Sequence, residues 1–220
     1  MKADILDIHT HKSETDSNGK SIINYRLREE GADALLFREG YYYSAGIHPY
    51  DVAGEGDSGL RMDVLRRLLA REEFVAVGEA GLDKLAAASM NAQLAVFRQQ
   101  VAVSEEYKLP LIIHCVRAME ELLAVKKEMK PVQAWIWHGF RGKPEQAAQL
   151  LQKGFYLSFG EYYSGEAMRI VPDERLFLET DESAVGIEEL LCQAAKVRGV
   201  GVEALRETVR RNIRNVFFCS

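Results

Sequence analysis

All five histidines of this chain stand within three residues of the ends of short apolar runs, and two carboxylates hold equivalent positions. Imidazole nitrogens and carboxylate oxygens together suit Zn²⁺, Mn²⁺, Fe²⁺ or Co²⁺ better than Mg²⁺ alone. Such ions lower the pKa of a water molecule and turn it into a nucleophile, so the set predicts metal-dependent hydrolysis. The candidate residues are His9, His11, His48, Glu79, His114, His138 and Asp181.

The spacing of the first pair is informative. His9 and His11 are two residues apart, so on a strand both side chains point to the same side. Two imidazoles could then share one metal ion. With Glu79, His114, His138 and Asp181 added, the set is large enough for one or two ions, and a carboxylate such as Glu79 would bridge two of them.

Each residue also has a plainer interpretation. A single strand-end histidine is usually exposed or hydrogen-bonded, Glu79 alone would suit a salt bridge, and Asp181 alone would suit a helix N-cap. Coincidence explains five such histidines poorly. Glu179 shares strand parity with Asp181, and it is equally interpreted as an acceptor for a ligand imidazole or as a paired core charge. Cys115 has the opposite parity to His114 and reads as a small buried residue.

The elements that must position these residues are eight apolar runs. Helical periodicity lies between several of them, at 91–107, 119–130 and 144–153. Repeated strand–helix units predict a single-domain α/β protein over 1–220, a (β/α) TIM-type barrel, whose strand ends converge on one face. An open doubly wound sheet is the alternative, but the first turn lacks a glycine-rich loop. The runs are 5–8, 21–24, 42–45, 74–77, 111–113, 134–137, 155–158 and 176–178.

Two loop regions complete this organisation. The segment 12–40 is too short for two full helices. We therefore expect the first βα units to be shortened. The segment 51–59 reads as a surface loop.

Composition narrows the class of protein. The 220 residues are 47% hydrophobic and 28% charged, as in ordinary globular proteins, and the net charge of -5 argues against a broad basic surface that coats nucleic acid. The three cysteines cannot all pair within one chain and show no C-x-x-C spacing, which favours a reducing compartment. Without a signal-peptide pattern or a long apolar run, we expect a cytoplasmic protein with no membrane partner.

Six motifs in register resemble the TatD family of metal-dependent hydrolases, within the amidohydrolase superfamily. The resemblance covers almost the whole chain. The motifs are Asp7-Ile8-His9-Thr10-His11, Gly46-Ile47-His48-Pro49, Gly78-Glu79-Ala80-Gly81-Leu82-Asp83, Leu109-Pro110-Leu111-Ile112-Ile113-His114, His138-Gly139-Phe140-Arg141-Gly142 and Leu178-Glu179-Thr180-Asp181.

The resemblance implies a TIM-type barrel with metal ligands at His9, His11, Glu79, His114, His138 and Asp181. It implies that Asp181 also takes the proton of the attacking water, with Glu79 as the second catalytic carboxylate. Substrate contacts are expected at His48, Asp83 and Arg117. The implied substrate is a phosphodiester at a DNA or RNA end, or a small phosphodiester.

The chain departs from the family pattern near the substrate. Arg117 is shifted by one place after His114, Arg141 stands where Thr or Ser is common, and Glu182-Ser183 replaces the usual small residue and proline. The chain is also shorter than typical members, chiefly before His48. These departures do not change the predicted metal ligands. They change positions at which a DNA exonuclease of the family would contact its substrate.

Three functions therefore stay open at this point. The first is a metal-dependent phosphodiesterase or nuclease, and the second is a hydrolase of a small amide, ester or lactone. The third is a barrel, with or without metal, that has lost turnover and serves in interactions. Oligomeric state, the metal used and the natural substrate are not specified by the sequence.

Overall fold

The computed structural model describes residues 4–12, 20–27, 40–53 and 58–218. Its eight strands are parallel and follow the order of a closed barrel, β1 to β8 in chain order, which confirms the predicted TIM-type architecture. All eight predicted strands are present. They are β1 (Asp7–Thr10), β2 (Ser21–Arg26), β3 (Tyr42–Gly46), β4 (Phe74–Asp83), β5 (Leu111–Val116), β6 (Trp135–Trp137), β7 (Tyr156–Phe159) and β8 (Leu176–Leu178).

Three predicted helices are confirmed as α3 (Met90–Tyr107), α4 (Met119–Met129) and α5 (Pro144–Gln152). The others are α2 (Ser58–Leu69), α6 (Gly165–Ile170), α7 (Ile187–Arg198) and α8 (Val202–Phe217), with short 3₁₀ turns η1 (Pro49–Asp51) and η2 (Asp173–Arg175). Most of 12–40, where shortened early units were predicted, and part of 51–59 lie outside the described residues, as does Cys219. Within the described residues, no helix combines the length and apolar character needed to cross a membrane.

The contacts divide the chain into two compact units. The first, here the outer-sequence unit, comprises residues 1–23, 40–42 and 135–220, and the second, the central-sequence unit, comprises 24–39 and 43–134. The single-domain organisation stays a prediction. Each unit is described by itself below.

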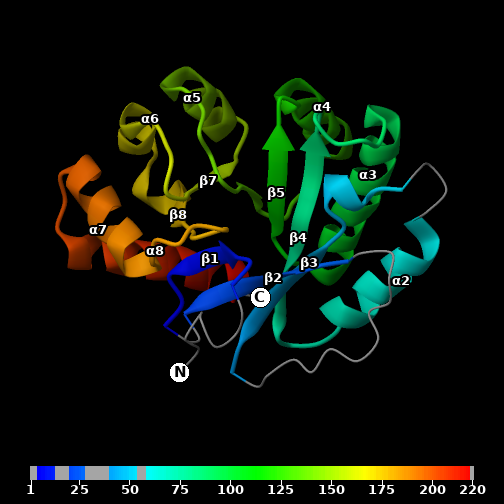
Figure 1. Cartoon of the computed structure of the whole chain (residues 1–220), viewed down its shortest axis with the longest axis horizontal. Helices are drawn as coiled ribbons and strands as arrows, with labels where there is room; N and C mark the ends of the chain where they lie inside the picture. Colours follow the sequence, from blue (N-terminus) through cyan, green and yellow to red (C-terminus); the bar gives the residue numbers. More distant parts are fainter. Residues whose placement is uncertain (1–3, 13–19, 28–39, 54–57, 219–220) are drawn as a thin grey trace. The chain divides into compact units, whose positions relative to one another are not determined.

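In the outer-sequence unit, β1 pairs with β2 and β8, and β7 pairs with β6 and β8. Helices α5 to α8 follow one another around these strands (Figure 1). Helix α8 shows why: its apolar residues Leu205, Val209 and Ile213 recur every four positions and are buried, so one stripe faces the strands. Burying a side chain of this size stabilises the fold by roughly 1.5–3 kcal/mol.

In the central-sequence unit, the long strands β4 and β5 lie side by side with α3 packed along β4 (Figure 1). The strands approach so closely that glycine is required between them. A Cβ atom on Gly81 would come within 1.8 Å of the backbone oxygen of His114. This contact fixes the backbone that carries His114 relative to β4.

Two buried glutamines of α3 also hold the backbone at the strand ends. Gln100 exchanges hydrogen bonds of 2.7 and 3.0 Å with the N–H and carbonyl of Ile47, directly before His48. Gln93 does the same for Asp83, at 2.8 and 2.9 Å. Helix α3 therefore fixes the backbone at two chemically important positions.

The side chain of Asp7 connects three segments of the outer-sequence unit. Its buried carboxylate accepts hydrogen bonds from the N–H groups of His9 and Thr180 and from the hydroxyls of Ser21 and Thr180, so it links β1 to β2 and to the segment after β8. Burial raises the pKa of Asp7 to about 7, although the hydrogen bonds from Thr180 and His9 favour the charged form.

We predict that Asp7→Ala destabilises the protein by about 3 kcal/mol or more, because four donors lose one shared acceptor in a buried place. Ser21→Ala, which removes one donor and leaves the other three, should cost about 1 kcal/mol. Urea unfolding followed by circular dichroism measures both. Equal, small losses in the two variants would contradict the role assigned to Asp7.

Candidate functional site

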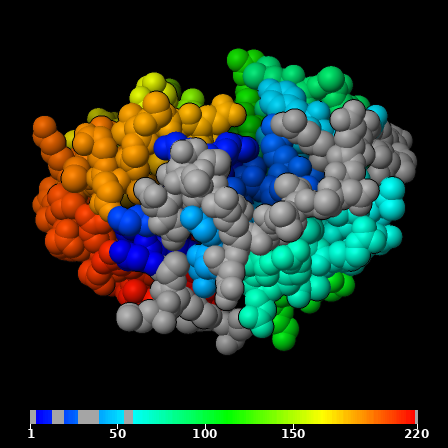
Figure 2. Space-filling view, turned by 60° about the horizontal axis from the view of Figure 1, so that its bottom comes forward, coloured from blue at the N-terminus to red at the C-terminus, as the bar shows by residue number. Residues whose placement is uncertain are grey.

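The outer-sequence unit brings together four of the predicted metal ligands and one further carboxylate. We call His9, His11, His138, Glu179 and Asp181 the first cluster. Asp181 Oδ1 lies 3.5 Å from His11 Nε2 and 3.8 Å from His9 Nε2, and the rings of His9 and His138 are 4.4 Å apart. Thr10 in β1 forms a bridge with Asp181 in the segment after β8, and Figure 2 shows blue N-terminal residues beside orange ones.

Asp181 is held in an uncommon backbone conformation. Its φ angle of 50° lies in the left-handed region, which aspartate tolerates better than most residues. Its N–H donates to the carbonyl of His9, and its carbonyl accepts from the N–H of His11. Both histidines of the pair are therefore tied through the backbone to the aspartate that their side chains approach.

Glu179 is fully buried beside His138. Its Oε1 accepts hydrogen bonds from the Gly139 N–H at 2.6 Å and lies 3.2 Å from His138 Nδ1. A carboxylate at Nδ1 keeps the proton there and leaves Nε2 as the nitrogen with a lone pair. Of the two interpretations that the sequence left equal, the geometry favours the acceptor for a ligand imidazole.

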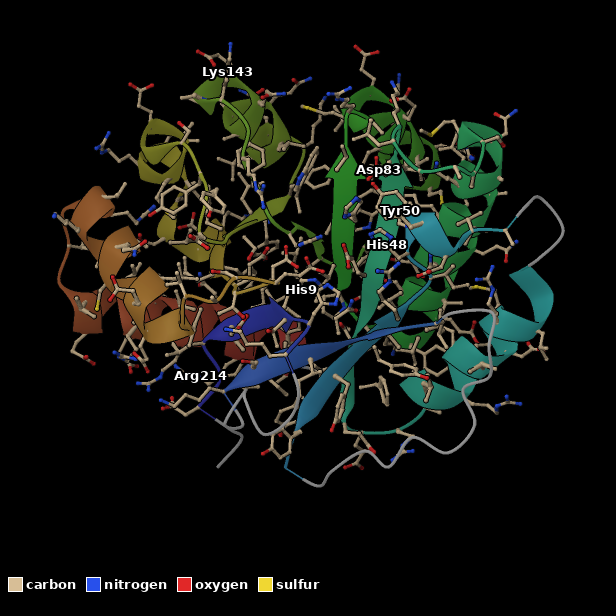
Figure 3. The ribbon with its side chains drawn as sticks, in the orientation of Figure 1. His9, His48, Tyr50, Asp83, Lys143 and Arg214 are labelled. Carbon is tan, nitrogen blue, oxygen red and sulfur yellow. The ribbon has the colours of Figure 1, made fainter. Side chains whose placement is uncertain are left out.

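The central-sequence unit holds a second set, which we call the second cluster: His48, Glu79, Asp83 and His114. Glu79 Oε1 lies 2.8 Å from His114 Nδ1 and 3.3 Å from His48 Nε2. The two imidazole rings are 4.4 Å apart. In Figure 3, His48, Tyr50 and Asp83 follow one another beside β4.

His114 lies between two carboxylates. Its Nε2 is 2.8 Å from Asp83 Oδ2, while its Nδ1 is the nitrogen near Glu79. Asp83 is 1% exposed, and its other oxygen accepts from the Leu85 N–H at 2.7 Å. The observed contacts of Asp83 thus orient His114, and the substrate contact expected for it stays a prediction.

One ring nitrogen of His48, Nδ1, accepts a hydrogen bond. The Tyr50 N–H donates to His48 Nδ1 at 3.1 Å, so the neutral ring carries its proton on Nε2 and can donate it to Glu79. Burial lowers the pKa of His48, although the nearby Glu79 carboxylate opposes this effect. The neutral form is therefore favoured at neutral pH.

Asn24 completes the surroundings of Glu79 and was not identified from the sequence. Its Oδ1 accepts from the Glu79 N–H at 2.9 Å, and its Nδ2 approaches Glu79 Oε2 at 3.4 Å. Ser44 donates to the same amide oxygen. An asparagine in a strand carries no spacing signal of its own, so only the pairing of elements reveals it.

Most of the predicted site residues thus belong to one of the two clusters, and Arg117 belongs to neither. The first cluster brings together four predicted ligands from β1 and the segments after β6 and β8, and the second brings together Glu79, His114, His48 and Asp83. Arg117 is exposed, with a φ angle of 56°, at the turn before α4. The ligand and substrate roles of all these residues stay predictions.

The donor set fits a divalent metal ion. Three-residue groups within each cluster offer ligand atoms that all lie within 4.8 Å of one another: His9, His11 and Asp181; His138, Glu179 and Asp181; and His48, Glu79 and His114. Glu179 Oε2 supports this fit, because within residues 4–12, 20–27, 40–53 and 58–218 this buried oxygen meets no hydrogen-bond donor. A buried carboxylate oxygen of this kind is costly without a cation.

Comparison with known proteins agrees with the resemblance. The family described as TatD related DNase matches residues 25–218. The chain is 34% identical to the uncharacterized metal-dependent hydrolase YabD of Bacillus subtilis over 149 residues, which are 64% of this chain and 58% of that protein. It is 30% identical to the 3'-5' ssDNA/RNA exonuclease TatD of Pantoea ananatis over 201 residues, 79% of this chain and 76% of that protein.

The fold has a counterpart among solved structures. The TatD homologue YJJV of Escherichia coli K12 superposes with a TM-score of 0.82 at 20% identity, covering 100% of both chains. At this identity the likeness concerns the fold.

We predict that Glu179→Gln weakens Mn²⁺ binding by roughly 10- to 100-fold without a large loss of stability. Glutamine retains an oxygen for the Gly139 N–H but removes the charge that faces His138. Isothermal titration calorimetry measures the affinity, and Glu182→Gln, which removes an exposed charge three positions away, is the matched control. An equal change in both variants would mean that Glu179 acts only through net charge.

Proposed function

Because the chain belongs to the TatD-related DNase family of metal-dependent hydrolases, we propose that it hydrolyses phosphodiester bonds with water activated by divalent metal. The proposed substrate is the end of a nucleic-acid strand or a small phosphodiester. The observation that carries the proposal is the gathering of histidines and carboxylates in each cluster, at the ends of the strands that carry them.

The proposed ligands are His9, His11, Glu79, His114, His138 and Asp181. A bound divalent ion supplies positive charge that acidifies water and neutralises a phosphoryl oxygen. The nitrogen and oxygen donors fit Zn²⁺, Mn²⁺, Fe²⁺, Co²⁺ or Mg²⁺, in one or two copies. His138 is held for this purpose by Glu179, and His114 by Asp83.

Asp181 is the proposed general base. Its side chain is 29% exposed, whereas the Glu79 side chain is 4% exposed, so Asp181 is the carboxylate that entering water can reach. Its Oδ1 lies 3.8 Å from His9 Nε2 and 3.5 Å from His11 Nε2, and a carboxylate in this position can accept a proton from water. Glu79, which is nearly enclosed by His48, His114 and Asn24, is suited to holding a ligand position.

The substrate class rests on two observations. The Pantoea ananatis relative is named as an exonuclease on single-stranded DNA and RNA. The net charge of -5 suits local recognition of a strand end better than a long electrostatic track. His48, a member of the second cluster, and Arg117, which directly follows β5, are the proposed substrate contacts.

We predict that Asp181→Asn lowers metal-dependent hydrolysis of bis-p-nitrophenyl phosphate by about 10²-fold or more, because the amide cannot accept the proton. Glu182→Gln, at the next position, should retain activity close to that of the wild type. Steady-state kinetics with added Mn²⁺ measure both variants, and thermal melting checks that they are folded. Retained turnover in Asp181→Asn would refute the assigned base.

A substrate panel separates the remaining alternatives. We expect the wild type to release nucleotides from single-stranded oligonucleotides and to cleave the small diester, in both cases only with divalent metal. Activity restricted to amides, esters or lactones would favour the small-molecule hydrolase. Absence of hydrolysis with every metal tried would favour the non-catalytic barrel.

A further inference from the structure

Four residues at the ends of consecutive strands of the outer-sequence unit form a feature that the proposed chemistry does not use. We call Arg141, Glu161, Tyr162 and Ser183 the shelf. Arg141 follows His138 by three residues, and Ser183 follows Asp181 by two. Two of the four shelf residues, Arg141 and Ser183, thus lie in loops that carry proposed ligands.

The centre of the shelf is an exposed aromatic ring with a cation over it. The guanidinium carbon of Arg141 lies 5.6 Å from the centroid of the Tyr162 ring, within the range of a cation–π contact. Tyr162 is 62% exposed, so most of its ring is open to solvent despite this contact. A rigid, exposed aromatic ring is a surface on which a planar group can stack.

The backbone under Arg141 is firmly anchored. The Gly139 N–H donates to Glu179, and the Phe140 N–H donates to the Ser158 carbonyl at 2.9 Å. The buried Phe140 ring packs edge-on against Trp137 and Phe159. Arg141 therefore projects from a fixed position next to His138.

The backbone around Tyr162 is anchored in a similar way. Its neighbour Tyr163 packs against Phe159, and Glu161 accepts a hydrogen bond from the Ser183 hydroxyl at 2.5 Å. Ser183 in turn donates its N–H to the Thr180 carbonyl, one residue before Asp181. The open ring is thereby tied to the loop of the proposed base.

The charges on the shelf identify what it can bind. Hydrogen bonds from Ser183 and Tyr162, with the nearby Arg141 charge, hold the pKa of Glu161 below its usual range. Glu161 is therefore ionised and offsets the charge of Arg141. A neutral shelf attracts phosphate weakly, whereas an aromatic ring stacks on any nucleobase at about 1–3 kcal/mol per base.

We propose that the shelf is a base-stacking subsite, in which the open face of Tyr162 receives a nucleobase that neighbours the scissile phosphodiester of a single strand. This proposal rests on the proposed function for the identity of the substrate.

The experiment compares binding and turnover in the full-length protein. Fluorescence anisotropy with a short labelled oligo(dT), in EDTA so that no turnover occurs, measures binding to the wild type, Tyr162→Ala, Tyr162→Phe and Lys143→Ala. Lys143 lies at the start of α5, close in sequence to Arg141 but outside the shelf, and provides the charge control (Figure 3). Kinetics on bis-p-nitrophenyl phosphate, which carries no nucleobase, provide the second readout.

We expect Tyr162→Ala to bind oligo(dT) about tenfold more weakly, with Tyr162→Phe and Lys143→Ala within about twofold of the wild type. The tenfold loss should be similar at about 50 and 200 mM salt, because stacking involves no counterion release. Turnover of the small diester should be unchanged in all three variants.

Equal binding by the wild type and Tyr162→Ala would overturn the proposal, as would equal losses in Tyr162→Ala and Lys143→Ala. So would a wild type that cleaves the small diester but does not bind oligo(dT). A wild type that binds oligo(dT) through Tyr162 but cleaves no phosphodiester would instead refute the proposed function and leave the subsite standing.

Discussion

Removing imidazole and carboxylate side chains from water is costly unless each finds a partner, and this constraint shapes both clusters. Glu79 and Glu179 are almost completely buried. The Glu79 carboxylate lies against nitrogens of His48 and His114, and the Glu179 carboxylate lies against His138 Nδ1 and accepts a hydrogen bond from the Gly139 N–H. The partner groups also fix which nitrogen of each ring carries the proton. The same contacts that make burial tolerable therefore prepare the rings to act as ligands.

Groups that are not themselves proposed ligands hold this arrangement in place. The amides of Gln93 and Gln100 fix the backbone at Asp83 and Ile47 from helix α3, and Asp7 links three strands behind His9. Gly81 allows β4 to approach the backbone of His114 at a distance that no side chain would permit. Each of these residues acts on a site residue through backbone geometry, so their loss would displace several polar groups together.

The strands, and the position of most polar residues at the strand ends, could be predicted from the sequence, because apolar runs and their polar ends are local signals. Strand β4 nevertheless extends to Asp83, well past the run that ends at Val77, because β5 continues to pair with it beyond the apolar residues. Asn24, Gln93 and Gln100 could not be assigned, since a polar residue within an element gains its role only from its partner. The pairing of Arg141 with Tyr162 joins two loops and has no signature in the spacing of either residue.

The central claim is that the two clusters hold divalent metal. Elemental analysis after dialysis against Mn²⁺ or Zn²⁺, on the wild type and on the His9→Ala/His11→Ala and Glu79→Gln variants, tests it most directly. The account predicts about one to two ions per wild-type chain and a clear loss in both variants, each of which removes ligands from one cluster. A wild type without metal, or variants that retain the full content, would contradict it.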